Sequence, residues 1–124
     1  MNENTTPVAL PVLPDGEFHA GLILKEDGTP DYWLVGLPGE LESADWQTAM
    51  DWANERGGNL PSLRELNLIR ANARQHFKNY WYWSCEAHES DSSWAWSQLF
   101  YYGYQIINRK YYQLRARAVR RLPI

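Results

Sequence analysis

Cysteine, long apolar runs and acidic residues after Asp91 are scarce in this 124-residue chain. The single cysteine, Cys85, excludes an internal disulfide and a zinc site built from several cysteines. No apolar run approaches the roughly 20 residues that cross a bilayer, so we expect no membrane insertion. The first residues lack the basic start and apolar centre of a signal peptide, and none is expected.

Length and composition predict one folded domain preceded by an arm. A 124-residue chain with 44% hydrophobic residues can bury a core of its own. Pro7, Pro11 and Pro14 favour an extended arm over a packed element. We therefore expect an extended arm over 1–14, which could dock on a second copy of the chain, and a single domain over 15–124.

Charge is divided unevenly along the chain. Residues 1–58 hold eleven acidic and two basic side chains (net −9), whereas 59–124 hold four acidic and ten basic (net +6). The last cations are Arg109, Lys110, Arg115, Arg117, Arg120 and Arg121, a clustering that can bind phosphate backbones. Because the acidic first half offers internal partners and the whole chain has a charge of −3, we expect these arginines to face carboxylates or solvent. Nucleic acid is not expected as a partner.

The first half of the domain predicts a hairpin and a helix. Strand-like runs over 20–24 and 32–37 flank Asp27-Gly28, which is a strong hairpin signal. Apolar residues at helical spacing then predict a helix over 44–56, with Ser43 as its N-cap.

A second helix and a strand-rich tail follow. Ser62 and Glu65 form a capping box at the start of this helix, which ends near His76. The hydrophobic period then changes from that of a helix to that of a strand, and strands are expected over 80–83, 94–100, 104–108 and 114–122. Hairpin, two helices and a C-terminal antiparallel meander make an α+β domain, in which we expect the first and last strands to pair.

Aromatic side chains concentrate in this tail. Seven of the eight tyrosines and four of the seven tryptophans lie between residues 79 and 113, among serines and asparagines. Tyr and Trp supply large, rigid contact area and Ser and Asn supply adaptable hydrogen bonds, as in antibody paratopes. The same aromatic residues also form strands and fill cores, which is the simpler alternative. We favour a binding face, with Trp83, Trp96, Phe100 and Val119 buried beneath it.

An ordered series of residues carries a family resemblance. The series is Trp52-Ala53-Asn54, Gly57-Gly58-Asn59-Leu60-Pro61-Ser62, Glu65-Leu66, Tyr82-Trp83-Ser84, Ala95-Trp96, Phe100, Gly103, Gln105 and Arg117-Ala118-Val119-Arg120-Arg121. It resembles the small phage and prophage members of the collagen-like-protein C-terminal (Lcl-C) domain family. The resemblance implies a C-type-lectin-like fold and a phage or prophage origin.

The same architecture is used by variable proteins of diversity-generating retroelements, whose reverse transcriptase mutates template adenines. The resemblance thus implies a variable ligand-binding surface within residues 80–113. Its expected members are Tyr80, Tyr82, Cys85, Asp91, Ser92, Ser97, Leu99, Tyr101, Tyr102, Tyr104, Ile106, Ile107, Asn108, Arg109, Tyr111 and Tyr112. Each is a residue type that adenine mutation of an asparagine codon can reach. Family members without a retroelement also vary here.

These patterns predict a non-enzymatic protein that binds a protein or cell-surface ligand. His19, His76 and His88 are scattered, and Glu86, Glu89 and Asp91 are too few to hold calcium, so no catalytic residue, metal or cofactor is expected. The alternative is a small phage-encoded intracellular effector that binds and inhibits a host protein. The host cytoplasm or the phage virion is the expected location.

Overall fold

The computed structural model describes residues 10–124, so the expected arm lies outside the described residues over 1–9. It contains helices α1 (Trp46–Glu55) and α2 (Leu63–Asn72) and a short 3-10 helix, η1 (Arg74–His76). The strands are β1 (Phe18–Leu24), β2 (Pro30–Gly36), β3 (Leu41–Ala44), β4 (Trp81–Ala87), β5 (Trp94–Leu99), β6 (Gln105–Arg109), β7 (Leu114–Ala116) and β8 (Val119–Pro123). The predicted α+β class is confirmed.

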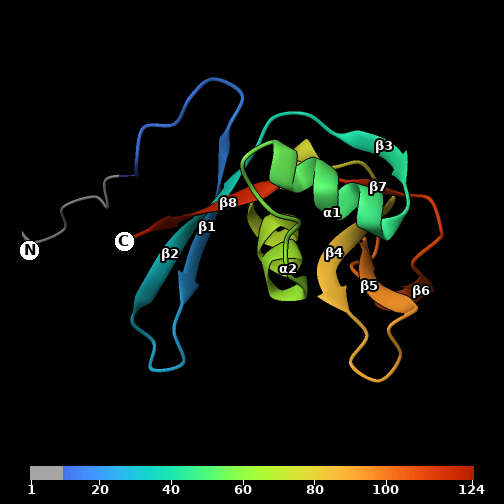
Figure 1. Cartoon of the computed structure of the whole chain (residues 1–124). Helices are drawn as coiled ribbons and strands as arrows, with labels where there is room; N and C mark the ends of the chain where they lie inside the picture. Colours follow the sequence, from blue (N-terminus) through green and yellow to red (C-terminus); the bar gives the residue numbers. More distant parts are fainter. Residues whose placement is uncertain (1–9) are drawn as a thin grey trace, which may run out of the picture.

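The strands form two sheets, with α2 between them (Figure 1), whereas α1 packs on the five-stranded sheet. One sheet has three strands in the order β1-β2-β8, and the other has five in the order β3-β7-β4-β5-β6. All pairs are antiparallel except β4 with β7. The predicted hairpin is β1-β2, and β4-β5-β6 is the predicted antiparallel meander.

Two predictions about the last strand are wrong. The strand pairs with β2, through Trp33 opposite Leu122 and Gly36 opposite Val119, and not with the first strand. The run expected over 114–122 is also divided into β7 and β8, which belong to different sheets. The break falls at Ala118, whose carbonyl accepts a hydrogen bond from the Leu37 N–H (2.9 Å). An alternating pattern records which face a residue occupies but not which sheet it joins, so the sequence could not reveal the break.

The sequence predicted the N-cap of α2 correctly but not the N-cap of α1. The capping box at α2 is confirmed: Ser62 Oγ accepts from the Glu65 N–H (3.1 Å) and Glu65 Oε1 accepts from the Ser62 N–H (2.8 Å). The N-cap of α1 is Asp45, which accepts from the Thr48 N–H (2.8 Å), and not Ser43. Ser43 lies in β3, which pairs with β7, and Asp caps a helix as well as Ser does.

Both faces of the five-stranded sheet are covered where β4 runs. On one face, α2 and the hairpin form a core that includes Leu34, Leu66 and Phe100. On the other, α1 packs against the fully buried Trp83, whose Nε1–H donates to the Ala44 carbonyl (2.9 Å). Trp83, Phe100 and Val119 are buried as predicted, whereas Trp96 is partly exposed.

The C-terminal arginines are paired with carboxylates, as predicted. Three ion pairs join β7 and β8 to earlier parts of the chain: Arg115 with Glu40, Arg120 with Glu17, and Arg121 with Glu65. Two of the three carboxylates belong to the acidic first half, and Glu65 is in α2. These ion pairs neutralise, within the protein, much of the positive charge that could otherwise bind a phosphate backbone.

Glu65 is the most deeply buried of these carboxylates, at 1% exposure. It accepts hydrogen bonds from Nε and Nη2 of Arg121, both at 2.7 Å, and from the hydroxyl of Tyr32. Burial alone would raise the pKa of Glu65, but the hydrogen bonds from Arg121, Tyr32 and the Ser62 N–H hold it below its ordinary value. Burial and the bond to Glu65 raise the pKa of Tyr32 to about 12.

Replacing Arg121 by methionine (R121M) is expected to lower the free energy of unfolding by about 3 kcal/mol, because it leaves a buried carboxylate without its cation. Urea denaturation at neutral pH measures this. The matched control is R120M, whose partner Glu17 is 13% exposed and whose loss should cost about 1 kcal/mol. Since the pKa of folded Glu65 lies below 4.5, its stabilisation is present above 4.5 and is lost as pH falls further. The difference in the free energy of unfolding between wild type and R121M should therefore become smaller at acidic pH. Equal losses in R121M and R120M would contradict the conclusion that Arg121 neutralises a buried carboxylate.

Candidate functional site: an exposed tyrosine surface

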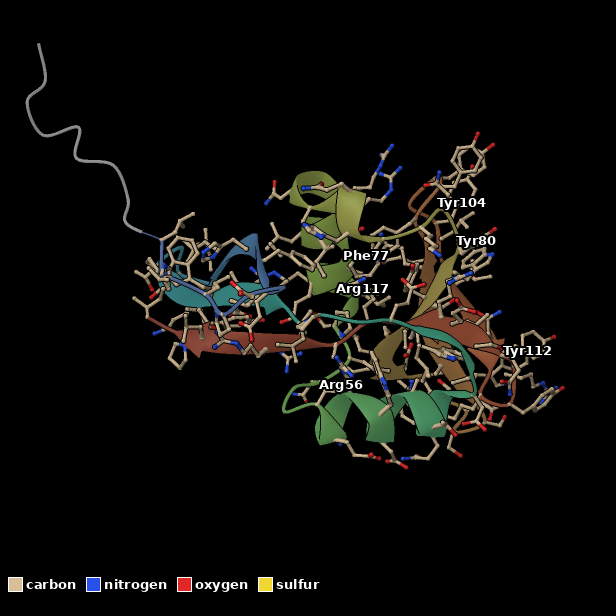
Figure 2. All side chains as sticks on the ribbon, turned by 90° about the horizontal axis from the view of Figure 1, so that it is seen from above. Arg56, Phe77, Tyr80, Tyr104, Tyr112 and Arg117 are labelled. Atoms are coloured by element: carbon tan, nitrogen blue, oxygen red, sulfur yellow. The ribbon has the colours of Figure 1, made fainter. Side chains whose placement is uncertain are left out.

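Six tyrosines are exposed along one side of the molecule, and we call them the tyrosine surface. Each exposes between 46% and 69% of its area; they are Tyr80, Tyr101, Tyr102, Tyr104, Tyr111 and Tyr112. Figure 2 shows Tyr80, Tyr104 and Tyr112 on the side opposite to the β1-β2 hairpin. Large aromatic rings gathered on one exposed side are typical of an interaction site.

Three connections of the five-stranded sheet carry these residues. Tyr80 immediately precedes β4, Tyr101 to Tyr104 connect β5 with β6, and Tyr111 and Tyr112 connect β6 with β7. The carbonyl of Tyr80 accepts from the Phe100 N–H (3.1 Å), which brings the first two connections together. The surface is therefore assembled from loops that a rigid sheet positions.

The rings are ordered against one another. Tyr102 stacks on Tyr101 (centroids 4.4 Å apart, 20° between planes) and on Tyr104 (5.3 Å, 26°). Tyr111 and Tyr112 meet edge to face at 5.4 Å. Each stacked ring covers a face of its neighbour, so ring edges and hydroxyls are left for contact with a ligand.

The β5-β6 turn that carries the stack is braced by α2. Arg70 donates from Nε to the Phe100 carbonyl (3.0 Å) and from Nη2 to the Tyr101 carbonyl (3.1 Å). Gly103 has a φ of 84°, which favours glycine, and a Cβ there would lie 3.1 Å from the Arg70 guanidinium. The turn is thus fixed before any ligand binds.

A shallow pocket of about 180 Å³ lies beside Tyr80. It is lined by Glu42, Tyr80, Trp81, Gln113, Leu114 and Arg115. The guanidinium of Arg115 lies 4.6 Å above the Tyr80 ring and pairs with Glu40. The volume is below the roughly 300–1,000 Å³ of small-molecule sites, which favours a place for one side chain of a larger ligand.

An apolar groove of about 390 Å³ lies at the hairpin end of the molecule. It is lined by Leu10, Leu22, Pro30, Trp33 and Ile124. Leu10 belongs to the expected arm, and the carbonyl of the next residue, Pro11, accepts a hydrogen bond from Nε2 of His19 (2.8 Å). The expected oligomer through the arm stays a prediction, because residues 1–9 lie outside the described part.

Ten of the residues expected in the binding surface are exposed: Tyr80, Asp91, Ser92, Tyr101, Tyr102, Tyr104, Ile106, Arg109, Tyr111 and Tyr112. Cys85, Leu99, Ile107 and Asn108 are half-buried. The structure does not gather all the exposed ones. Asp91 and Ser92 follow β4, and Arg109 ends β6 opposite Trp94, so they lie at the other end of the sheet from Tyr80 and the tyrosine stack. Tyr111 and Tyr112 leave β6 at this other end, where the Tyr112 N–H donates to the Arg109 carbonyl (3.0 Å).

Tyr82 was wrongly placed on the binding surface, because it is fully buried. Its ring packs against Phe77 and Phe100, and its hydroxyl donates to Glu40 (2.6 Å) and accepts from the Lys78 N–H (2.9 Å). Burial and the bond to Glu40 raise the pKa of Tyr82. The alternation of β4 implied an outward face, but both faces of this strand are covered.

Ser97 was wrongly placed for the same reason. It lies in the middle of β5, fully buried, and its hydroxyl donates to Oδ1 of Asn108 (2.5 Å). Cys85 packs beside the core under α1, where burial raises the pKa of its thiol. Ser97 cannot meet a ligand without displacing a neighbouring element.

The acidic loop after β4 uses its polar groups locally. Asp91 accepts from the N–H (3.0 Å) and hydroxyl (2.7 Å) of Ser93, and these bonds lower the pKa of Asp91. Nδ1 of His88 accepts from the Ser90 N–H (3.2 Å). Within residues 10–124 no cluster of three or more His, Cys, Asp or Glu side chains could hold a metal ion.

Sequence reasoning missed two contributors to the site. Arg70 looked like an ordinary cation on an amphipathic helix, and nothing local indicated its reach to the β5-β6 turn. Glu42, for which the sequence indicated no role, lies in β3 and lines the pocket. The roles of these two residues depend on which elements of the fold pack together, and a local sequence pattern does not show that.

No model of a known protein family matches the chain, and no curated protein matches it significantly. The resemblance to the Lcl-C family therefore stays a prediction. None of the helices in the described part is long and apolar enough to cross a membrane.

Tyrosine-to-phenylalanine substitutions distinguish core from surface. Y82F should lower the free energy of unfolding by about 1–3 kcal/mol, because the partly buried Glu40 and the Lys78 N–H each lose a hydrogen-bond partner. The matched control Y104F removes a hydroxyl from a ring that is 61% exposed and should change it by less than about 0.5 kcal/mol. Chemical denaturation measures both, and equal losses would contradict the burial of Tyr82.

Proposed function

We propose that the protein is a non-enzymatic binding module whose tyrosine surface contacts a protein or cell-surface ligand. The observation that carries the proposal is the exposure of six tyrosines, each by 46% or more, on one side of the molecule. An aromatic ring that is exposed to water contributes little to the stability of the isolated domain. Each would contribute substantially to an interface, because Tyr and Trp dominate binding energy there.

Preorganisation supports the same function. The stack of Tyr101, Tyr102 and Tyr104 is ordered on a turn that Arg70 and Gly103 fix. A ligand that meets ordered rings loses less conformational entropy on binding than one that must order them. The arrangement is that of a rigid aromatic anchor set flanked by the small pocket beside Tyr80.

The fold and origin that we propose are those implied by the resemblance: a C-type-lectin-like domain from a phage or prophage, diversified by a retroelement. In support, the chain runs from a hairpin through two helices to a meander, and its last strand returns to the sheet of the hairpin. A reverse transcriptase gene beside a near-repeat of the sequence encoding residues 80–113 would support diversification, and a gene without either would refute it. The alternative of an intracellular effector uses the same surface and differs in location.

Substituting two stacked tyrosines tests the binding function directly. A random-peptide library displayed on phage particles is selected on the wild-type protein, and enriched peptides are synthesised with a fluorescent label. Y101S/Y104S should weaken their binding, measured by anisotropy, about a hundredfold, or 2.7 kcal/mol. The melting temperature should stay nearly unchanged, because both rings are more than half exposed.

The matched control is L24S, which changes an exposed apolar residue of the hairpin (39% exposed) and should leave peptide binding unaltered. Peptides that bind wild type and Y101S/Y104S equally well would refute the proposal. An unfolded Y101S/Y104S variant would also count against it, because the two rings would then belong to the core.

A further inference from the structure

We infer that the ligand presents an acidic polypeptide segment to one part of the tyrosine surface, the corner formed by Tyr80, Tyr101, Tyr102 and Tyr104. This inference rests on the proposed binding function and names the chemistry of the partner. Two observations support it: the distribution of charge around the corner, and the contacts that its aromatic rings already make within the protein.

The segments that build the corner contain no carboxylate. Residues 66–85 supply the end of α2, η1 and the start of β4, and residues 92–124 supply the β5-β6 turn; neither segment contains an Asp or a Glu. Two carboxylates of the preceding part of the chain lie beside Tyr80: Glu42 lines the pocket together with the cation Arg115, and Glu40 pairs with Arg115. The corner therefore differs in charge from the protein as a whole, which carries −3.

The three cations of residues 66–85 are not neutralised by a carboxylate of the described residues. Arg70 donates to two backbone carbonyls of the turn, which are uncharged acceptors, so its full positive charge remains beside Tyr101. Arg74 is the first residue of η1, and Lys78 precedes Tyr80 by two residues; both are exposed. Within residues 10–124 none of the three is in an ion pair, in contrast to Arg115, Arg117, Arg120 and Arg121.

Cations interleaved with aromatic rings are also typical of single-stranded nucleic-acid sites, where bases stack on free ring faces. In this corner several of the ring faces are already occupied. Tyr102 is stacked on both sides, by Tyr101 and by Tyr104, and the Arg115 guanidinium lies over Tyr80. The outer faces of Tyr101 and Tyr104 remain, together with ring edges and phenolic hydroxyls. The hydroxyls donate hydrogen bonds to carboxylates and backbone carbonyls. These groups fit a polypeptide better than a row of bases.

The composition of selected peptides and the response to charge reversal test the inference. Peptides selected from a displayed random library on the wild-type protein should be enriched in Asp and Glu. R74E and K78E should each weaken binding of such a peptide about tenfold at low salt, and the loss should shrink as salt is raised. The matched control K25E makes the same charge change in the β1-β2 turn and should alter binding less than about twofold, because its charge is distant and screened.

The outcomes separate this inference from the proposed function. Peptides that require Tyr101 and Tyr104 but lack acidic enrichment, and that bind R74E and K78E normally, would overturn the inference and leave the proposed function standing. Peptides indifferent to the tyrosine substitutions would overturn both. A labelled oligothymidylate is tested in the same assay. If it binds the wild-type protein more tightly than every selected peptide and loses binding to Y101S/Y104S, the ligand of the corner is a nucleic acid and not a polypeptide.

Discussion

The buried carboxylate of Glu65 joins parts of the fold that are distant in the sequence. It caps the N-terminus of α2 by accepting a hydrogen bond from the Ser62 N–H, and it accepts hydrogen bonds from Tyr32 of β2 and Arg121 of β8. A carboxylate that is 1% exposed is strongly unfavourable unless all these partners are present. The three-stranded sheet and α2 can therefore pack in only one register relative to each other.

The position of α2 in turn determines the geometry of the tyrosine surface. Two turns beyond its capped end, the helix presents Arg70 to the carbonyls of Phe100 and Tyr101. At its start, the Leu63 carbonyl accepts from Nε2 of Gln105 (3.0 Å), which is the first residue of β6. Both ends of the β5-β6 connection are thus tied to one helix. The aromatic stack is held by a helix whose own position depends on Glu65, and this rigidity is what an anchor set for binding needs.

Local signals in the sequence predicted local structure well. The capping box of Ser62 and Glu65 and the Asp27-Gly28 turn each involve a few adjacent residues, and both are present. The burial of Tyr82 and the separation of β7 from β8 depend on the packing of elements far apart in the chain. The exposed tyrosines could be predicted as a group because they cluster in connections, whereas alternation within β4 and β5 could not show that both faces of the sheet are covered.

Oxidative footprinting of tyrosines tests the central claim most directly, because it measures which rings are exposed and which are covered by a ligand in one experiment. The account predicts that hydroxyl radicals modify Tyr101, Tyr102 and Tyr104 in the free protein and spare Tyr82. A bound selected peptide should protect those three rings and leave the hairpin residue Trp33 unchanged. Protection at Trp33 with continued oxidation of Tyr101, Tyr102 and Tyr104 would contradict the account and place the binding site at the opposite end of the molecule.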